Sequence, residues 1–252
     1  MLIYNPISPT YVTQEFGENN ACVKVDIEGR ISRPMRIIGK VKGNVCPVGY
    51  KELYPLLGLE AHNGTDIIAY HNQPCYFPIM AETEWYCKEA NDVDGGIGVD
   101  VFSKKRIHVP YLPEEAGTQA RREWQENGEK LLVKYRVWHL LSGRVDEDVA
   151  PGELIGYCDN TGASGGDHAH VALKFVDETG KVLDRDNGYY GCVSMNLWRV
   201  DKFILDSLYR KQVLTRTQQI SSVFLAFQII IKDFKILVQR LMGTFQKQRS
   251  GD

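Results

Sequence analysis

Short apolar runs separated by turn residues dominate the chain up to about residue 200. Six of these runs are rich in β-branched and aromatic residues, at positions 23–27, 35–41, 97–102, 131–140, 153–158 and 168–176. Glycine, proline, asparagine and aspartate interrupt the sequence between them. Short runs of this composition with frequent turns predict an antiparallel, mainly β domain. We expect this domain to cover residues 1–198.

A polar, glutamate-rich segment interrupts the run of expected strands. It occupies about residues 104–130 and contains the sequence EEAGTQARREWQ at 114–125. We expect a long insertion between two strands, helical in part around these residues.

The composition of the sequence and its apolar pattern change after residue 198. Glycine and proline almost vanish, and apolar residues follow helical spacing at 220, 223, 227, 230, 234, 237 and 241. Residues 201–252 also carry nine Lys or Arg against four Asp. The pattern predicts a basic amphipathic helical tail over 199–252, with its helix at 216–242. Such a helix can pack on the domain, associate with a copy of itself, or dock on a partner or a membrane surface.

Composition narrows the class of protein. Of the 252 residues, 43% are hydrophobic and 25% charged, which excludes a disordered, collagenous or purely coiled-coil chain. Thirty basic and 32 acidic residues give a formal net charge of −2, and a general nucleic-acid binder is normally far more basic. We therefore expect no nucleic-acid partner.

We find no targeting signal for export in the sequence. It has no signal peptide at its start and no apolar stretch long enough for a membrane-spanning helix. The six cysteines are scattered without a C-x-x-C pair, so we interpret them as reduced thiols. We expect a chain synthesised in the cytoplasm.

Four of the six histidines fall in three short motifs. His168 and His170 flank Ala169 in a strand-like run, so both project from one face of that strand. Two neighbouring imidazoles suit a metal site with an adjacent acid–base group, although H-x-H alone is a weak signal. His139 ends another strand-like run, in the sequence YRVWHLL.

A third motif strengthens the prediction of a metal site. In His62-Asn63-Gly64-Thr65-Asp66 the Asn-Gly pair favours a turn, and a turn can bring His62 and Asp66 onto one ion. Two histidines and one carboxylate leave the fourth position of a tetrahedral zinc open for water, which is the arrangement of a catalytic site. Such a site polarises a scissile carbonyl and activates its bound water.

The order of these motifs resembles the lysostaphin/LytM-type zinc metalloendopeptidases, which hydrolyse peptidoglycan and have the duplicated hybrid motif fold. The resemblance extends from about residue 12 to about residue 198. It implies an antiparallel β-roll with a substrate groove, acting on the peptide part of bacterial peptidoglycan. It also implies one zinc ion per chain, held by His62, Asp66 and His170, with His139 and His168 as the catalytic pair.

The chain departs from that family around the H-x-H motif. Its turn reads Ser164-Gly165-Gly166-Asp167, where the family usually has S-T-G-P, and Ala169 replaces a bulkier residue. For the tyrosine that often faces the metal, the candidates are Tyr50 and Tyr54. No ligand position is lost, so we expect an active enzyme.

The function expected from this resemblance is hydrolysis of peptide bonds in the bacterial cell wall by zinc-activated water. Without a signal peptide, the enzyme would act as a phage lysin, as a virion-associated protein, or after export by a specialised route. One alternative is a non-catalytic LytM-like scaffold that binds peptidoglycan or activates a partner hydrolase. Another is a D,D-carboxypeptidase with the same metal geometry.

Overall fold

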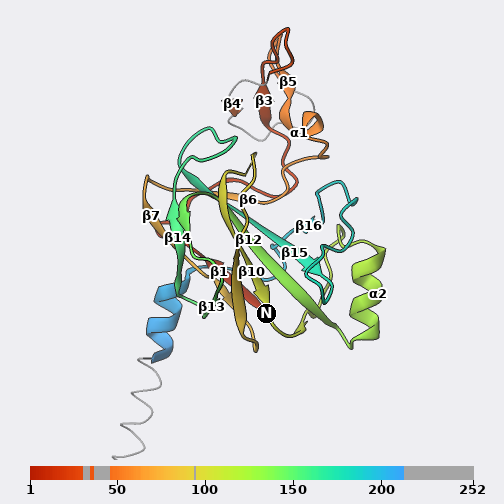
Figure 1. Ribbon diagram of the computed structural model, residues 1–252, viewed down its shortest axis with the longest axis vertical. Helices are drawn as coiled ribbons and strands as arrows, with labels where there is room; N and C mark the ends of the chain where they lie inside the picture. Colours follow the sequence, from red (N-terminus) through yellow and green to blue (C-terminus); the bar gives the residue numbers. More distant parts are fainter. Residues whose placement is uncertain (31–34, 37–45, 94, 213–252) are drawn as a thin grey trace, which may run out of the picture. The chain divides into compact units, whose positions relative to one another are not determined.

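Antiparallel strands make up most of the protein in the computed structural model, which describes residues 1–30, 35–36, 46–93 and 95–212 (Figure 1). The chain divides into two units, Met1–Ile204 and Leu205–Asp252, and all the strands among the described residues belong to the first. The mainly β, antiparallel fold class expected from the sequence is therefore confirmed.

The largest sheet has eleven strands, and every pairing within it is antiparallel. Its main path runs in the order β13 (Glu147–Val149), β9 (Trp85–Glu89), β10 (Ile97–Ser103), β12 (Lys130–Gly143), β15 (His168–Val176), β6 (Thr65–Ile68) and β2 (Val12–Gln14). The other strands are β11 (Ile107–His108) on β12, β16 (Cys192–Val193) on β15, and β14 (Leu154–Cys158), which joins β12 to β7 (Gln73–Tyr76).

The two faces of this sheet differ because strand side chains alternate. On β12 the odd-numbered residues form part of the buried core, namely Leu131, Val133, Tyr135 and Val137. Its even-numbered residues from Lys134 to Trp138 line a cavity on the other face. The core is therefore on one side of the central strands and the cavity on the other.

Two smaller sheets complete the first unit. One has the order β17 (Arg199–Phe203), β1 (Leu2–Asn5), β8 (Ile79–Met80), with β1 and β17 parallel. The other has the order β4 (Met35–Arg36), β3 (Ala21–Val23), β5 (Lys51–Glu52), and the short helix α1 (Leu53–Leu56) follows it.

The insertion expected at 104–130 contains β11 and the helix α2 (Thr118–Glu126), which packs beside β12 (Figure 1). The carboxylate of Asp184 accepts hydrogen bonds from the backbone N–H groups of Gln119 and Ala120, at 2.9 and 2.8 Å. A carboxylate at this end of a helix satisfies amides that have no partner within the helix.

Four of the six expected strands are found close to their predicted limits, as β10, β12, β14 and β15. Of the run at 23–27 only Val23 belongs to a strand, β3; Val25 forms a single bridge, and the chain then turns at positions 27 and 28. The run at 35–41 contributes β4, and its remaining residues lie outside the described part of the chain.

The structure corrects two further expectations. Cys22 and Cys46 form a disulfide, so the expectation of six reduced thiols was wrong for this pair. The pair is separated by 24 residues, a spacing that a search for C-x-x-C does not detect. The other four cysteines are free and buried. Residues 199–203 belong to β17 and not to a helical tail, because β1 offers them an edge with which to pair.

The expected C-terminal helix is described only at its start. Residues 204–212 are helical, and the segment 216–242 lies outside the described residues. Within the part of the chain that the structure covers, no helix is long and apolar enough to cross a membrane.

Candidate metal centre

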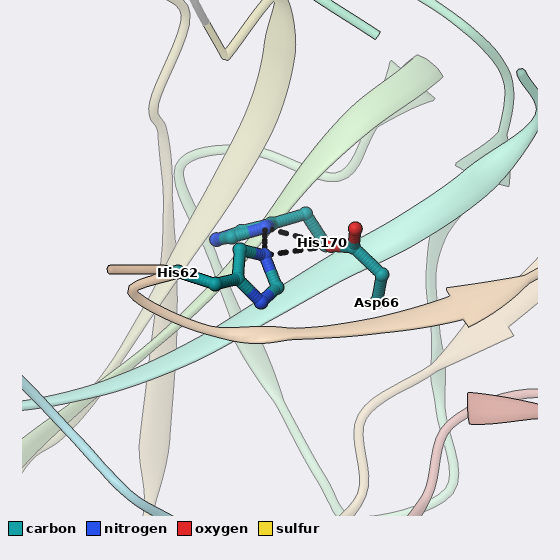
Figure 2. A group of neighbouring side chains, drawn as sticks. All are labelled: His62, Asp66 and His170. Atoms are coloured by element: carbon teal, nitrogen blue, oxygen red, sulfur yellow. Dashed lines mark hydrogen bonds and ion pairs between the residues drawn. The ribbon is translucent and has the colours of Figure 1, made fainter. Parts of the chain in front are cut away.

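Three side chains from separate parts of the sequence meet at one point of the first unit. His62 comes from the loop before β6, Asp66 from β6 and His170 from β15. Asp66 and His170 are cross-strand partners in the antiparallel pair, and Figure 2 shows all three side chains pointing toward one another. All three are buried, with 3–5% of their surface exposed.

The three potential ligand atoms form a nearly equilateral triangle. Nε2 of His62 lies 3.1 Å from Nδ1 of His170 and 3.1 Å from Oδ1 of Asp66, and the third side measures 2.9 Å (Figure 2). Zn–N and Zn–O bonds of about 2.1 Å imply about 3.4 Å between neighbouring ligands of a tetrahedral ion. The donor set and the size of the triangle therefore fit a small divalent cation such as zinc.

A backbone carbonyl fixes the orientation of the first ligand. Nδ1 of His62 lies 3.1 Å from the carbonyl oxygen of Glu15. A carbonyl can only accept, so Nδ1 carries the proton and Nε2 offers its lone pair to the triangle. Metal-binding histidines are commonly oriented by such a bond from their second nitrogen.

His139 reaches the site through an irregularity in β12. Between Val99 and Ile97 the register of β10 on β12 shifts by one residue, and His139 has a left-handed φ of 62°. This β-bulge places two successive side chains, Trp138 and His139, on the cavity face, where strict alternation would turn His139 into the core with Val137. The imidazole of His139 lies with its centroid 4.5 Å from that of His168.

In His139 and His168, as in His62, Nδ1 is hydrogen-bonded to a backbone carbonyl. Nδ1 of His139 donates to the carbonyl of Thr161 at 2.7 Å, and Nδ1 of His168 donates to the carbonyl of Gly166 at 2.8 Å. In the neutral rings Nε2 is then the basic nitrogen. Nε2 of His168 lies 3.5 Å from Oδ1 of Asp66.

Electrostatics favour the charge states that a metal site requires. Burial opposes ionisation of Asp66, but the surrounding His62, His168 and His170 outweigh it and hold the pKa of Asp66 well below its ordinary value. Burial lowers the pKa of His170 to about 4, against the opposing pull of Asp66. Burial also lowers the pKa of His139 to about 3, and the neighbouring histidines add to the shift. At neutral pH Asp66 is thus a carboxylate, and His139 and His170 are neutral imidazoles.

Close packing supports the triangle from behind. Nε2 of His170 lies against Gly64, where an added Cβ would come within 2.5 Å, and the ring of Trp138 lies 5.6 Å from that of His170. The ring of Tyr54 lies 5.6 Å from that of His62. Of the two tyrosine candidates, Tyr54 therefore adjoins the site and lines its cavity.

The structure brings together all five side chains singled out in the sequence. The triangle, His139 and His168 line one cavity of about 940 Å³. A second group capable of holding a cation, His71, Asp159 and Asp167, has its ligand atoms within 4.8 Å of one another but is more exposed. Sequence reasoning did not identify Thr161, Gly166 and Glu15, because they act through their backbone carbonyls.

No protein-family profile and no curated protein matches the sequence. A zinc-containing peptidase from Vibrio cholerae has a similar structure at 15% identity and a TM-score of 0.37, over 73% of this chain and 39% of that one. A variant of the catalytic domain of the prophage-encoded M23 protein EnpA from Enterococcus faecalis aligns at 16% identity with a TM-score of 0.35. The alignment covers 71% of this chain and 91% of that one. The catalytic domain of lysostaphin from Staphylococcus simulans aligns at 16% identity with a TM-score of 0.30, over 50% of this chain and 77% of that one.

Proposed function

We propose that this chain is a zinc metallopeptidase that hydrolyses peptide bonds in bacterial cell-wall peptidoglycan. The observation that carries the proposal is the convergence of five side chains on one cavity. Three of them form the ligand triangle, and His139 and His168 stand beside it with Nε2 as their basic nitrogen.

His62, Asp66 and His170 would hold one zinc ion per chain. When bound at three protein ligands, zinc lowers the pKa of a coordinated water to about 7 and polarises a carbonyl oxygen. The carbonyls behind His62, His139 and His168 hold these rings in a fixed orientation toward the site.

His139 and His168 supply the acid–base chemistry. Amide hydrolysis requires a group that removes a proton from the attacking water and a donor that stabilises the tetrahedral oxyanion. A neutral imidazole protonated at Nδ1 accepts a proton at Nε2, and the imidazolium so formed can donate it onward to the leaving amine. Because burial lowers the pKa of His139 to about 3, this ring is neutral at the start of the cycle.

The substrate assignment rests on the order of motifs, H-x-x-x-D, then aromatic-H-L, then H-x-H, in the sequence. We therefore expect the enzyme to act at the cell wall, as a phage lysin, a virion-associated enzyme or a protein exported by a specialised route. The cavity extends beyond the triangle along β12 and β15, as binding of an extended peptide requires.

The decisive experiment measures soluble fragments released from purified sacculi, with mass spectrometry of the products. Wild type is compared with His170→Ala and with His108→Ala, which removes an exposed histidine of β11. We expect zinc-dependent release by wild type and His108→Ala, and none by His170→Ala. The new amine end in the products identifies the bond, and its position separates internal cleavage from removal of a terminal residue.

Zinc content of the same preparations tests the alternative. A wild-type chain that holds one zinc but releases nothing from Gram-positive or Gram-negative sacculi contradicts the enzyme proposal. That outcome favours the non-catalytic scaffold.

A further inference from the structure

The cavity face of the central sheet carries a group of basic side chains next to the metal centre. Lys134 and Arg136 on β12 and Lys174 on β15 point to the same face as Trp138 and His170, because they differ from them by even numbers of residues. In the antiparallel register Trp138 faces His170, and Lys134 faces Lys174. We call Lys134, Arg136 and Lys174 the cationic floor.

The cationic floor has more positive than negative charge. Asp100 on β10 pairs with both Lys134, at 3.2 Å, and Arg136. Nζ of Lys174 donates to the carbonyl of Tyr190 at 2.9 Å, and no carboxylate of the described residues forms an ion pair with it. Two of the three cations thus share one carboxylate, and the third, Lys174, is bound to a neutral carbonyl. Asp92, in the loop before β10, acts on Arg136 only from further away.

This excess charge is buried. Lys134 and Lys174 each expose 6% of their surface, and Asp100 exposes 5%. Burying a charge without a counter-charge is costly, because the protein interior solvates ions poorly. Consistent with that cost, burial lowers the pKa of Lys134 despite the attraction of Asp100. A bound anion would reduce the cost of burying this positive charge.

The cationic floor and the metal centre line the same cavity, which Lys181 and Arg185 also line. Strand residues rise about 3.4 Å each, so Arg136, opposite Ala172, lies about 7 Å along the sheet from His170, and Lys174 about 14 Å. An extended peptide has nearly the same rise. A peptide whose scissile bond sits at the metal centre therefore places its residues two to four positions away over the cationic floor.

We propose that the cationic floor binds carboxylates of the substrate, so that the enzyme selects acidic peptides over neutral ones. The inference rests on the proposed peptidase function and adds the substrate class. Charge-assisted hydrogen bonds from Lys and Arg to a carboxylate are stronger than those between neutral groups. A glycine-rich peptide without carboxylates would leave the excess charge uncompensated.

The test uses peptides released from sacculi by a glycan-cleaving enzyme, in two forms. One form keeps its free carboxylates, and in the other they are converted to carboxamides with carbodiimide and ammonia. Calorimetry measures the Kd of each form on the zinc-loaded His139→Ala chain, which should bind without turnover. We expect binding of the carboxamide form to be weaker by at least about tenfold, with a stronger salt dependence for the acid form.

Variants then locate the effect. Lys174→Met should reduce the preference for the acid form severalfold, whereas Lys174→Arg should retain it. Lys130→Met removes an exposed lysine from the start of β12 and should behave as wild type. The comparison of two peptides on one protein needs no variant at position 174, so loss of folding in Lys174→Met does not leave the proposal untested.

The outcomes separate the two proposals. Equal affinity for the acid and carboxamide forms overturns the carboxylate site, and so does an equal loss of preference in Lys130→Met and Lys174→Met. Cleavage by wild type without discrimination overturns this inference and leaves the peptidase intact. Discrimination in binding with no cleavage by wild type overturns the peptidase and keeps the carboxylate site.

Discussion

The imidazole of His170 rests on the backbone of Gly64. A Cβ at position 64 would lie 2.5 Å from Nε2 of His170 and 2.6 Å from the carbonyl oxygen of Val171. A Cβ does not approach a non-bonded nitrogen or oxygen so closely, and the carbonyl belongs to a strand whose displacement would break its pairing. The absence of a side chain at position 64 is thus part of what places the third ligand.

We expect Gly64→Ala to weaken zinc binding by about 10- to 100-fold, because displacing His170 distorts the triangle. Zinc affinity measured by competition with a chromophoric chelator checks this. Gly166→Ala is the matched control, since a Cβ there meets nothing within 4 Å. If the two alanine variants bind zinc alike, Gly64 does not position the ligand.

Replacing His139 should separate metal binding from catalysis. This ring is outside the triangle, so His139→Ala should keep one zinc per chain while kcat falls by about 10²- to 10⁴-fold, the range typical of general acid–base groups. Zinc analysis and turnover of soluble muropeptides measure the two properties. A variant that loses zinc together with activity would place His139 among the structural supports of the site.

Removing the metal should destabilise the fold. A ligand that binds only the native state stabilises it by about 4 kcal/mol at a thousand times its Kd. We expect a chelator to lower the Tm of wild type, and added zinc to restore it. In His62→Ala, where one corner of the triangle is lost, the Tm should respond little to either treatment. A wild-type Tm indifferent to zinc and chelator would contradict a metal site at these residues.

Acid should destabilise the metal-free protein before its carboxylates titrate. Histidines in an unfolded chain titrate near pH 6.5, whereas burial lowers the pKa of His170 to about 4 and that of His139 to about 3. Between these pH values the unfolded chain binds more protons than the folded chain does. The contribution of each buried, neutral histidine to folding stability is therefore complete above about pH 6.5 and falls as the pH drops. Each ring can account for roughly 3 kcal/mol by pH 4.

Urea unfolding of the metal-free chain from about pH 7.5 to about pH 4 measures this slope. His139→Gln, which cannot titrate, should show a shallower loss of stability than wild type. A parallel pH dependence in the two proteins would contradict the assignment of a depressed pKa to His139.

Much of the site could be predicted from local sequence. The spacing of two in His168-Ala169-His170 places both rings on one strand face, and the Asn63-Gly64 turn brings His62 back toward Asp66. Both arguments use only the period of a strand and the preference of Asn-Gly for turns. Four of the six expected strands, β10, β12, β14 and β15, were confirmed for the same reason.

The remainder depends on pairings that local patterns do not encode. Strict alternation places His139 in the core, and only the bulge against β10 turns it to the cavity. The cationic floor arises because the register sets Lys134 opposite Lys174, two residues 40 positions apart. The disulfide and β17 likewise join segments distant in sequence, which is why the cysteine and tail predictions were wrong there.

The parallel pairing of β1 with β17 has a further consequence, since Ile3 faces Arg199 and Asn5 faces Phe203. The first and last strands of the Met1–Ile204 unit are thus neighbours in one sheet. A unit whose ends meet can be inserted into a loop of another protein, or its ends can be joined by a short linker and new ends opened in an exposed turn. The β unit is in this sense a transferable module, provided that the cut is made after β17.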